Sequence, residues 1–112
     1  DPYLQAKTDE WLFWEQYSHE PVIAVRRFQK HYLNKPDSEI DPALLTKGAK
    51  VLAHLEQAVT GRDWLVGDSL SLADLSLVAY TRLAEEGGFD LNAYPALKDW
   101  IDKIDAAIPL TP

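Results

Sequence analysis

The first third of the chain carries large apolar side chains at intervals of three and four residues, which is typical of one face of an α-helix. Between Ala6 and Leu33 these side chains are Trp11, Trp14, Val25, Phe28 and Tyr32. Pro21 interrupts the stretch. Because proline lacks an amide proton and clashes with the preceding turn, we expect a kink or a break there. The pattern predicts one bent helix, or two helices in series.

A second helical stripe follows the loop-forming segment 34–38. Asp41 and Pro42 suit the N-cap and the first position of a helix. The stripe consists of Leu45, Gly48, Leu52, Leu55 and Val59. Gly61 then suits the C-terminal stop. The connection 62–68 that comes next is apolar in its middle, so we expect it to pack against the rest of the protein.

The sharpest local signal is a helix start at Ser71. Ser71 and Asp74 have the spacing of a capping box, in which the hydroxyl accepts the later amide and the carboxylate accepts the earlier one. Leu70 and Leu75 stand at the hydrophobic-staple positions. We expect this helix to run to about Glu86. Asp74 is therefore assigned to the helix start and not to general-base catalysis, and its replacement by alanine should cost about 0.5–2 kcal/mol.

A last helix should begin between Asn92 and Pro95 and end at Pro109, with Pro112 beyond it. Its apolar face is formed by Leu97, Ile101, Ile104 and Ile108. No segment shows the strict alternation expected of a β-strand. The pattern therefore predicts a single all-α domain over residues 1–112, a bundle of four to five helices with short connections.

Composition and charge narrow the class of protein. The chain has 112 residues, of which 46% are hydrophobic and 26% charged, as in ordinary globular domains. Its net charge is −7 and its tightest basic pair is Arg26-Arg27, so we expect no nucleic-acid partner. Cysteine is absent, which excludes disulfides and a thiolate nucleophile, and no apolar run approaches the roughly 18 residues that cross a membrane. Because methionine is also absent, we expect the chain to be part of a longer protein.

Candidate catalytic groups are few. The three histidines, His19, His31 and His54, lie far apart and lack metal-ligand spacing, so we expect no metal site and a solvated or hydrogen-bonded role for each. Ser18, His19 and Glu20 are the residue types of a catalytic triad, but adjacent helical residues point in different directions. We therefore assign no catalytic residue to this chain.

An aromatic cluster is the most ambiguous feature. Trp11, Phe13, Trp14 and Tyr17 place four aromatic rings within seven residues, which covers more than one helical face. One core cannot bury them all. The surplus face could pack against a second domain, form a dimer contact, or line an apolar ligand site.

Three segments carry a family resemblance. The run from Asp63 to Asp74 resembles the signature of the C-terminal domain of glutathione transferases, in which an aromatic-Leu-x-Gly segment leads through this capping box into a buried helix. Tyr94 to Trp100 resembles the family's start of the following helix. Trp11 to Pro21 is similar to the first helix of this domain in bacterial members. Together the three segments extend the resemblance over essentially the whole chain.

The resemblance implies the helical half of an enzyme. In that family an N-terminal thioredoxin-like domain binds glutathione and carries the catalytic Ser, Tyr or Cys, while the helical domain supplies part of the hydrophobic electrophile pocket and of the dimer interface. On this basis we expect Phe13, Trp14 and Tyr17 to bind substrate, glutathione to be the co-substrate, and no metal to be needed. The parent should be a cytoplasmic homodimeric transferase, and this chain alone should be inactive.

The same helical domain also resembles modules in translation elongation-factor subunits and aminoacyl-tRNA synthetases, where it serves as an assembly platform. A non-catalytic protein-interaction module is therefore the alternative hypothesis, because a fold does not by itself determine an activity. A transferase should carry a thioredoxin-like pattern with a cis-Pro loop upstream. The similarity of Trp11 to Pro21 to bacterial transferases favours the enzyme.

Overall fold

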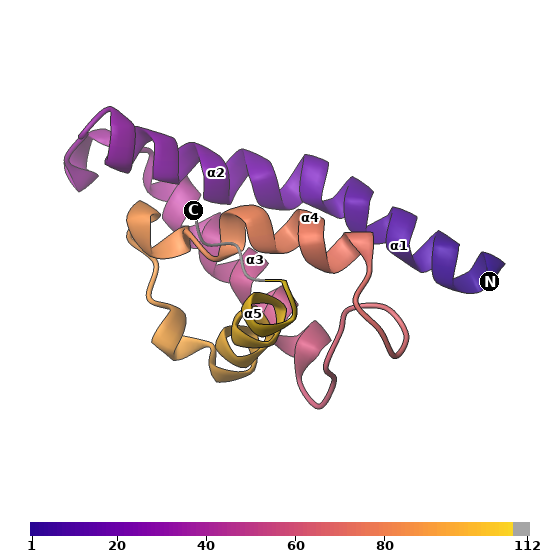
Figure 1. Cartoon of the computed structure of the whole chain (residues 1–112). Helices are drawn as coiled ribbons and strands as arrows, with labels where there is room; N and C mark the ends of the chain where they lie inside the picture. The colour runs from indigo at the N-terminus through magenta and orange to yellow at the C-terminus, as the bar shows by residue number, and fades with distance from the viewer. Residues whose placement is uncertain (109–112) are drawn as a thin grey trace.

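The computed structural model describes residues 1–108, and within them the chain forms helices and turns but no β-strand. The α-helices are α1 (Pro2–Trp14), α2 (Glu20–Arg27), α3 (Pro42–Val59), α4 (Leu72–Thr81) and α5 (Pro95–Ala107). α1 and α2 form one long rod that lies across α4 and α3, and α5 packs on the opposite side of those two helices (Figure 1). The predicted all-α fold is confirmed.

The first rod is built differently from its prediction. It begins at Pro2, where the Asp1 side chain caps the first turn, and it continues to a second π-helical segment, Phe28–Tyr32. The expected kink at Pro21 is replaced by a π-helical turn over Glu15–His19. Pro21 follows directly, in the first turn of α2, so its ring meets this wide turn and the rod continues without a break.

The aromatic stripe coincides only in part with the inner face of the rod, because Trp11 and Trp14 pack against the core as partly buried side chains. Phe28 and Tyr32 are exposed. The buried side chains, again at steps of three and four, are Glu15, His19, Val22, Ile23 and Arg26. Three of these five are polar or charged, and the π turn shifts the register of the residues that follow it. Apolar periodicity therefore indicated a helix correctly but did not identify its inner face.

The core forms where α3, α4 and α5 meet beneath the rod. Its largest fully buried side chains include Trp100, Ile23, Leu52, Leu55, Leu77 and Leu97. The α3 stripe is buried as predicted except for Leu45, which is exposed in the first turns of the helix. Gly48 is required by a close approach, because a β-carbon there would overlap the Phe89 ring. The connection 62–68 packs inward through Leu65 and Val66, as expected.

For the last two helices, the first residues agree with the prediction better than the last residues do. α4 stops at Thr81, short of Glu86, and a separate 3₁₀ turn (Ala84–Gly87) completes the segment before Gly88, whose φ of +92° reverses the chain. In α5 the predicted apolar face is buried at Leu97, Ile101 and Ile104. The expected helix end at Pro109 and Pro112 lies outside the described residues.

The capping box at Ser71 is present and does more than start a helix. The fully buried Asp74 carboxylate accepts hydrogen bonds from the Ser71 amide (3.0 Å), the Leu65 amide (2.9 Å) and the Trp100 indole N–H (2.8 Å). Leu70 and Leu75 are half-buried against the core. Asp74 thereby ties the start of α4 to the preceding connection and to α5.

Candidate functional site

The three residues predicted to bind substrate do not face one hollow. Phe13 and Tyr17 lie one helical turn apart and are 65% and 79% exposed. Trp14 is half-buried and packs against the core. Successive helical residues are rotated by about 100°, so Trp14 turns away from the face that its two neighbours share. Of the three, Trp14 lines a cleft beside α3, and Tyr17 lines a different hollow.

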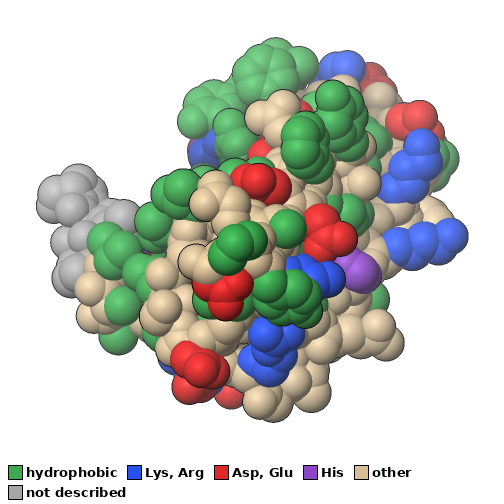
Figure 2. All heavy atoms as spheres, turned by 90° about the vertical axis from the view of Figure 1, so that its right-hand side faces the viewer, with side chains coloured by type: hydrophobic (Ala, Val, Ile, Leu, Met, Phe, Trp, Pro, Cys, Tyr) green, Lys and Arg blue, Asp and Glu red, His purple; other side chains and the backbone are tan. Residues whose placement is uncertain are grey.

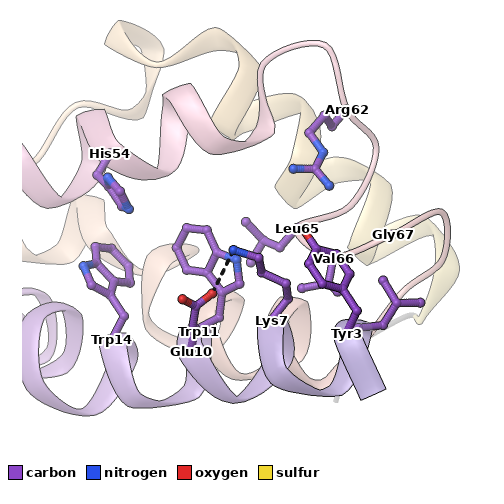
Figure 3. Close-up of a pocket in the computed structure, with 11 residues that line it drawn as sticks. Tyr3, Lys7, Glu10, Trp11, Trp14, His54, Arg62, Leu65, Val66 and Gly67 are labelled. Carbon is purple, nitrogen blue, oxygen red and sulfur yellow. Dashed lines mark ion pairs between the residues drawn. The ribbon is translucent and has the colours of Figure 1, made fainter. Parts of the chain in front are cut away.

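The cleft around Trp14 has a volume of about 540 Å³ and lies between α1, the second half of α3 and the connection that follows α3. The rings of Trp11 and Trp14 meet edge to face, with 5.4 Å between their centroids. The His54 ring, from α3, lies 5.0 Å from that of Trp14. Figure 3 shows His54 and Arg62 entering the cleft from the side opposite the two indoles.

Polar groups stand at the mouth of this cleft. Lys7 Nζ lies 3.1 Å from Glu10 Oε2 and 5.8 Å from the centre of the Tyr3 ring. The Glu10 carboxylate raises the pKa of Lys7, which keeps its ammonium charged, although solvent screens this exposed pair. Figure 2, which views the molecule from the N-terminal end of α1, shows apolar side chains beside Lys or Arg side chains and a histidine. Such a surface suits an aromatic or apolar group with a polar end.

A second hollow, of about 400 Å³, lies beside α2 and is lined in part by Phe28, Tyr32 and Tyr80. The Arg27 guanidinium lies 5.2 Å from the centre of the Tyr32 ring and pairs with Glu86, which raises the pKa of Arg27. Sequence periodicity placed Phe28 and Tyr32 on one helical face with Trp11 and Trp14, and it did not predict this hollow. The signal for it was their separation of four residues, which puts two aromatic rings on one helical face.

A third hollow, of about 430 Å³, lies between α2 and α3. Tyr17, Pro21 and Val22 form its side on the rod, and Lys47 and Lys50 come from α3. It therefore combines apolar walls with two exposed ammonium groups.

A buried polar cluster lies beneath the rod where it packs on α4. His19 Nε2 lies 2.7 Å from Thr81 Oγ1, and the Thr81 hydroxyl donates to the Leu77 carbonyl. Burial lowers the pKa of His19 to about 4. Burial, and then the charge of Glu20, raises the pKa of Glu15. His19 is thus a hydrogen-bonded core histidine, one of the two roles expected for it.

The described chain offers walls and not reactive groups. Among residues 1–108 no group of three or more His, Asp or Glu side chains gathers closely enough to hold a metal ion. Over the same residues, no helix is both long and apolar enough to cross a membrane. What the three hollows provide is aromatic, aliphatic and charged surface.

Comparison with known proteins connects this fold to a family. The family model for the glutathione S-transferase C-terminal domain matches residues 12–107. A glutathione S-transferase structure from Pseudomonas fluorescens Pf-5 has a TM-score of 0.93 at 38% identity, covering 100% of this chain and 57% of that one. Another, from Xanthobacter autotrophicus Py2, has a TM-score of 0.89 at 42% identity, covering 98% and 54%.

A curated relative is more distant in sequence. The disulfide-bond oxidoreductase YfcG of Escherichia coli K12 is 27% identical over 104 residues, which are 89% of this chain and 46% of that protein. The chain thus spans about half the length of the relatives it matches. Because the family model covers nearly the whole chain and the helices superpose on those of solved members, the chain belongs to the glutathione S-transferase C-terminal domain family.

Proposed function

We propose that this chain is the helical half of a glutathione transferase and forms one wall of its site for hydrophobic electrophiles. In this proposal the remainder of the enzyme is an N-terminal thioredoxin-like domain that binds glutathione and carries the catalytic Ser, Tyr or Cys. The observation that carries the proposal is the outward aromatic face of the first rod, with Phe13 and Tyr17 exposed in a member of this family. Exposed aromatic groups of this kind mark binding surfaces.

The reaction forms a carbon–sulfur bond. The glutathione thiolate attacks an electrophilic carbon, and the leaving group departs with its bonding electrons. The contribution of this chain is to hold the apolar part of the electrophile beside the thiolate, which replaces a bimolecular encounter by proximity. Aromatic walls such as those of Phe13, Trp14 and Tyr17 provide large apolar contact area with few rotatable bonds. The chain alone has no thiol-activating group, so we propose that it is inactive by itself.

The parent is further proposed to be a cytoplasmic homodimer, since the reaction needs a glutathione pool and the cytosol maintains one. Part of the dimer interface would come from the N-terminal end of α1. The aromatic cleft at Trp11 and Trp14 remains open there, and Tyr3 is exposed at its edge. Analytical ultracentrifugation of the full-length protein measures this directly, and a monomer at micromolar concentration would contradict it.

The first test uses the full-length protein. We expect it to be retained on immobilised glutathione and to conjugate glutathione with 1-chloro-2,4-dinitrobenzene, followed by the absorbance of the thioether product. Retention with turnover supports the transferase. The absence of both contradicts it and favours the protein-interaction module instead.

The wall residues are tested separately. Single alanine variants of Phe13, Trp14 and Tyr17 should each lower kcat/KM for an aromatic electrophile by roughly tenfold, the effect of losing about 1–2 kcal/mol of apolar contact. Leu72→Ala, which removes an exposed apolar side chain of α4, is the matched control and should leave kcat/KM unchanged. If kcat/KM is unchanged in all three variants, these residues do not form the electrophile wall, and the hollow of Phe28, Tyr32 and Tyr80 becomes the candidate instead.

A further inference from the structure

Two titratable side chains face each other inside the protein, where the π turn of the first rod packs on α3 and α4. Glu15 is 7% exposed and His19 is fully buried. Glu15 Oε1 lies 3.8 Å from His19 Nδ1. The Trp14 ring covers the histidine, with 5.8 Å between the ring centroids. This pair has no place in the proposed wall of the electrophile site, so its presence in the core requires another explanation.

The hydrogen bond on the far side of the imidazole determines where its proton lies. Thr81 has one hydroxyl proton and donates it to the Leu77 carbonyl at 2.6 Å. Its oxygen can therefore only accept from His19, 2.7 Å away, so Nε2 carries a hydrogen. In neutral imidazole Nδ1 is then a bare lone pair. Nδ1 is also the buried ring nitrogen that has no hydrogen-bond partner.

An ionised Glu15 would direct a second set of lone pairs at this nitrogen. Buried polar groups are nearly always hydrogen-bonded, and two facing acceptors with little water between them repel each other. One proton removes the conflict, whether a carboxylic acid donates to Nδ1 or an imidazolium N–H donates to the carboxylate. The two atoms, 3.8 Å apart, need to approach by about 1 Å to reach hydrogen-bond length.

The surroundings favour retention of that proton. Burial raises the pKa of Glu15, and the negative charge of Glu20, on the same rod, raises it further. From α3, the His54 ring packs against Trp14, and α4 presents the uncharged Thr81 hydroxyl. Among the described residues, neither member of the pair has another ion-pair partner within 4 Å. No cationic side chain among the described residues, other than a protonated His19, is therefore placed to balance this carboxylate.

We propose that Glu15 and His19 together hold a single buried proton in the native protein at neutral pH, and that its release at higher pH weakens the packing of the first rod on α4. The pair is thus a pH-sensitive element of the fold. Because burial disfavours the imidazolium, and lowers the pKa of His19 to about 4, the proton resides on the Glu15 carboxyl. The inference concerns stability and does not depend on the proposed transferase activity.

The sign of the pH effect follows from counting protons. In the unfolded chain the two groups titrate at their ordinary values of 4.5 and 6.5. Between these values the unfolded chain and the native pair each hold one proton, so the pair adds no pH dependence. Above 6.5 the unfolded chain has lost its proton while the native pair keeps one. Stability then falls by about tenfold in the folding equilibrium constant per pH unit, until the native pair deprotonates.

Glu15→Gln is the decisive variant, because the amide N–H can donate to Nδ1 without titrating. We would measure urea unfolding of the full-length protein from pH 5.5 to pH 8.5 for the wild type and this variant. The ratio of folding equilibrium constants, variant over wild type, should rise by about tenfold per pH unit across this window, since one native proton distinguishes the two proteins. Glu39→Gln, which removes an exposed carboxylate, is the matched control and should give a constant ratio. A constant ratio for Glu15→Gln above pH 6.5 overturns the proposal.

A second measurement does not depend on the stability of a variant. In the wild-type protein at pH 7, nitrogen NMR of labelled histidine should show His19 neutral with its hydrogen on Nε2, and infrared spectroscopy should show one carboxylic-acid carbonyl band from a buried glutamic acid. A neutral His19 without such a band would mean that the pair holds no shared proton, and the proposal would be wrong. The Nδ1–H tautomer would overturn it as well.

Discussion

α1 and α4 are helices of similar length, yet only α4 has fully buried residues. Five of the ten residues of α4 are buried: Ala73, Asp74, Leu77, Val78 and Thr81. None of the 13 residues of α1 is buried, although its sequence contains six aromatic or leucine side chains. α4 therefore belongs to the interior of this domain, whereas α1 exposes apolar side chains that another domain, subunit or ligand could cover.

The contrast also shows how each helix is stabilised. An isolated helix of this length is marginal in water, so α4 depends on tertiary packing and on its capping box. α1 contacts α4 and packs Trp11 and Trp14 against the core, but it buries no side chain fully. It continues through the π turn into α2, which buries Val22, Ile23 and Arg26. A substitution at a buried position of α4 should thus act on the stability of the domain, and one at an exposed position of α1 on what the domain binds.

The largest effect is expected at Asp74. Asp74→Ala removes the acceptor of four hydrogen bonds: two buried ones, from the Leu65 amide and the Trp100 indole N–H, and two partly buried ones, from the Ser71 amide and hydroxyl. Each of the two buried donors left without a partner costs about 1–3 kcal/mol and the lost helix cap about 0.5–2 kcal/mol, so the variant should lose about 3 kcal/mol or more of unfolding free energy in a urea titration. This exceeds the range expected for a helix cap alone, because sequence did not reveal the bonds to Leu65 and Trp100.

Ser71→Ala is the control for this prediction. It removes only the cap side chain and should cost about 0.5–2 kcal/mol. Equal losses in the two variants would show that the contacts of Asp74 with the connection and with α5 contribute nothing measurable.

Truncating one leucine in each helix tests directly how much α1 and α4 contribute to the stability of the domain. Leu77 of α4 is fully buried, so Leu77→Ala should cost about 2–5 kcal/mol. Leu4 of α1 is exposed at the rim of the aromatic cleft, so Leu4→Ala should cost no more than about 0.5 kcal/mol. Urea unfolding of both variants checks the difference, and similar losses would mean that α1 contributes to the core as much as α4 does.

The smallest effect on stability is expected at the outward face of α1 and the π turn. Phe13→Ala and Tyr17→Ala should each change the unfolding free energy by no more than about 0.5 kcal/mol, because both side chains are largely in solvent. Thermal melts followed by circular dichroism check this. A loss of stability that appears only in the full-length protein would identify Phe13 or Tyr17 as a contact with the remainder of the enzyme.

Local signals in the sequence were sufficient for most of the fold. Asp41 caps α3 through the Ala43 amide, and the box at Ser71 starts α4. Both were predictable because caps depend on residues two or three positions apart. The stripes of α3 and α5 were also found, since apolar side chains dominate their inner faces. The surplus of aromatic groups near Trp14 correctly indicated that some would remain outside the core.

The candidate site was predicted less well. Phe13 and Tyr17 share one face of the rod, whereas Trp14 turns to another. The far wall of the cleft at Trp14 comes from His54 and the connection after α3. The hollow at Phe28 and Tyr32 depends on Tyr80 from α4, far away in sequence. A hollow between helices is defined by how they pack, which a periodic pattern within one helix does not contain.

What the sequence by itself determined is the all-α class, the caps and most helix starts, because these depend on the chemistry of neighbouring residues. Only the tertiary structure decided which face of the first rod lies inside. His19 and Arg26 are buried because distant groups, the Thr81 hydroxyl and the Gly87 carbonyl, supply their hydrogen-bond partners. A polar side chain enters a core when partners there replace the water it loses, and those partners come from the other helices.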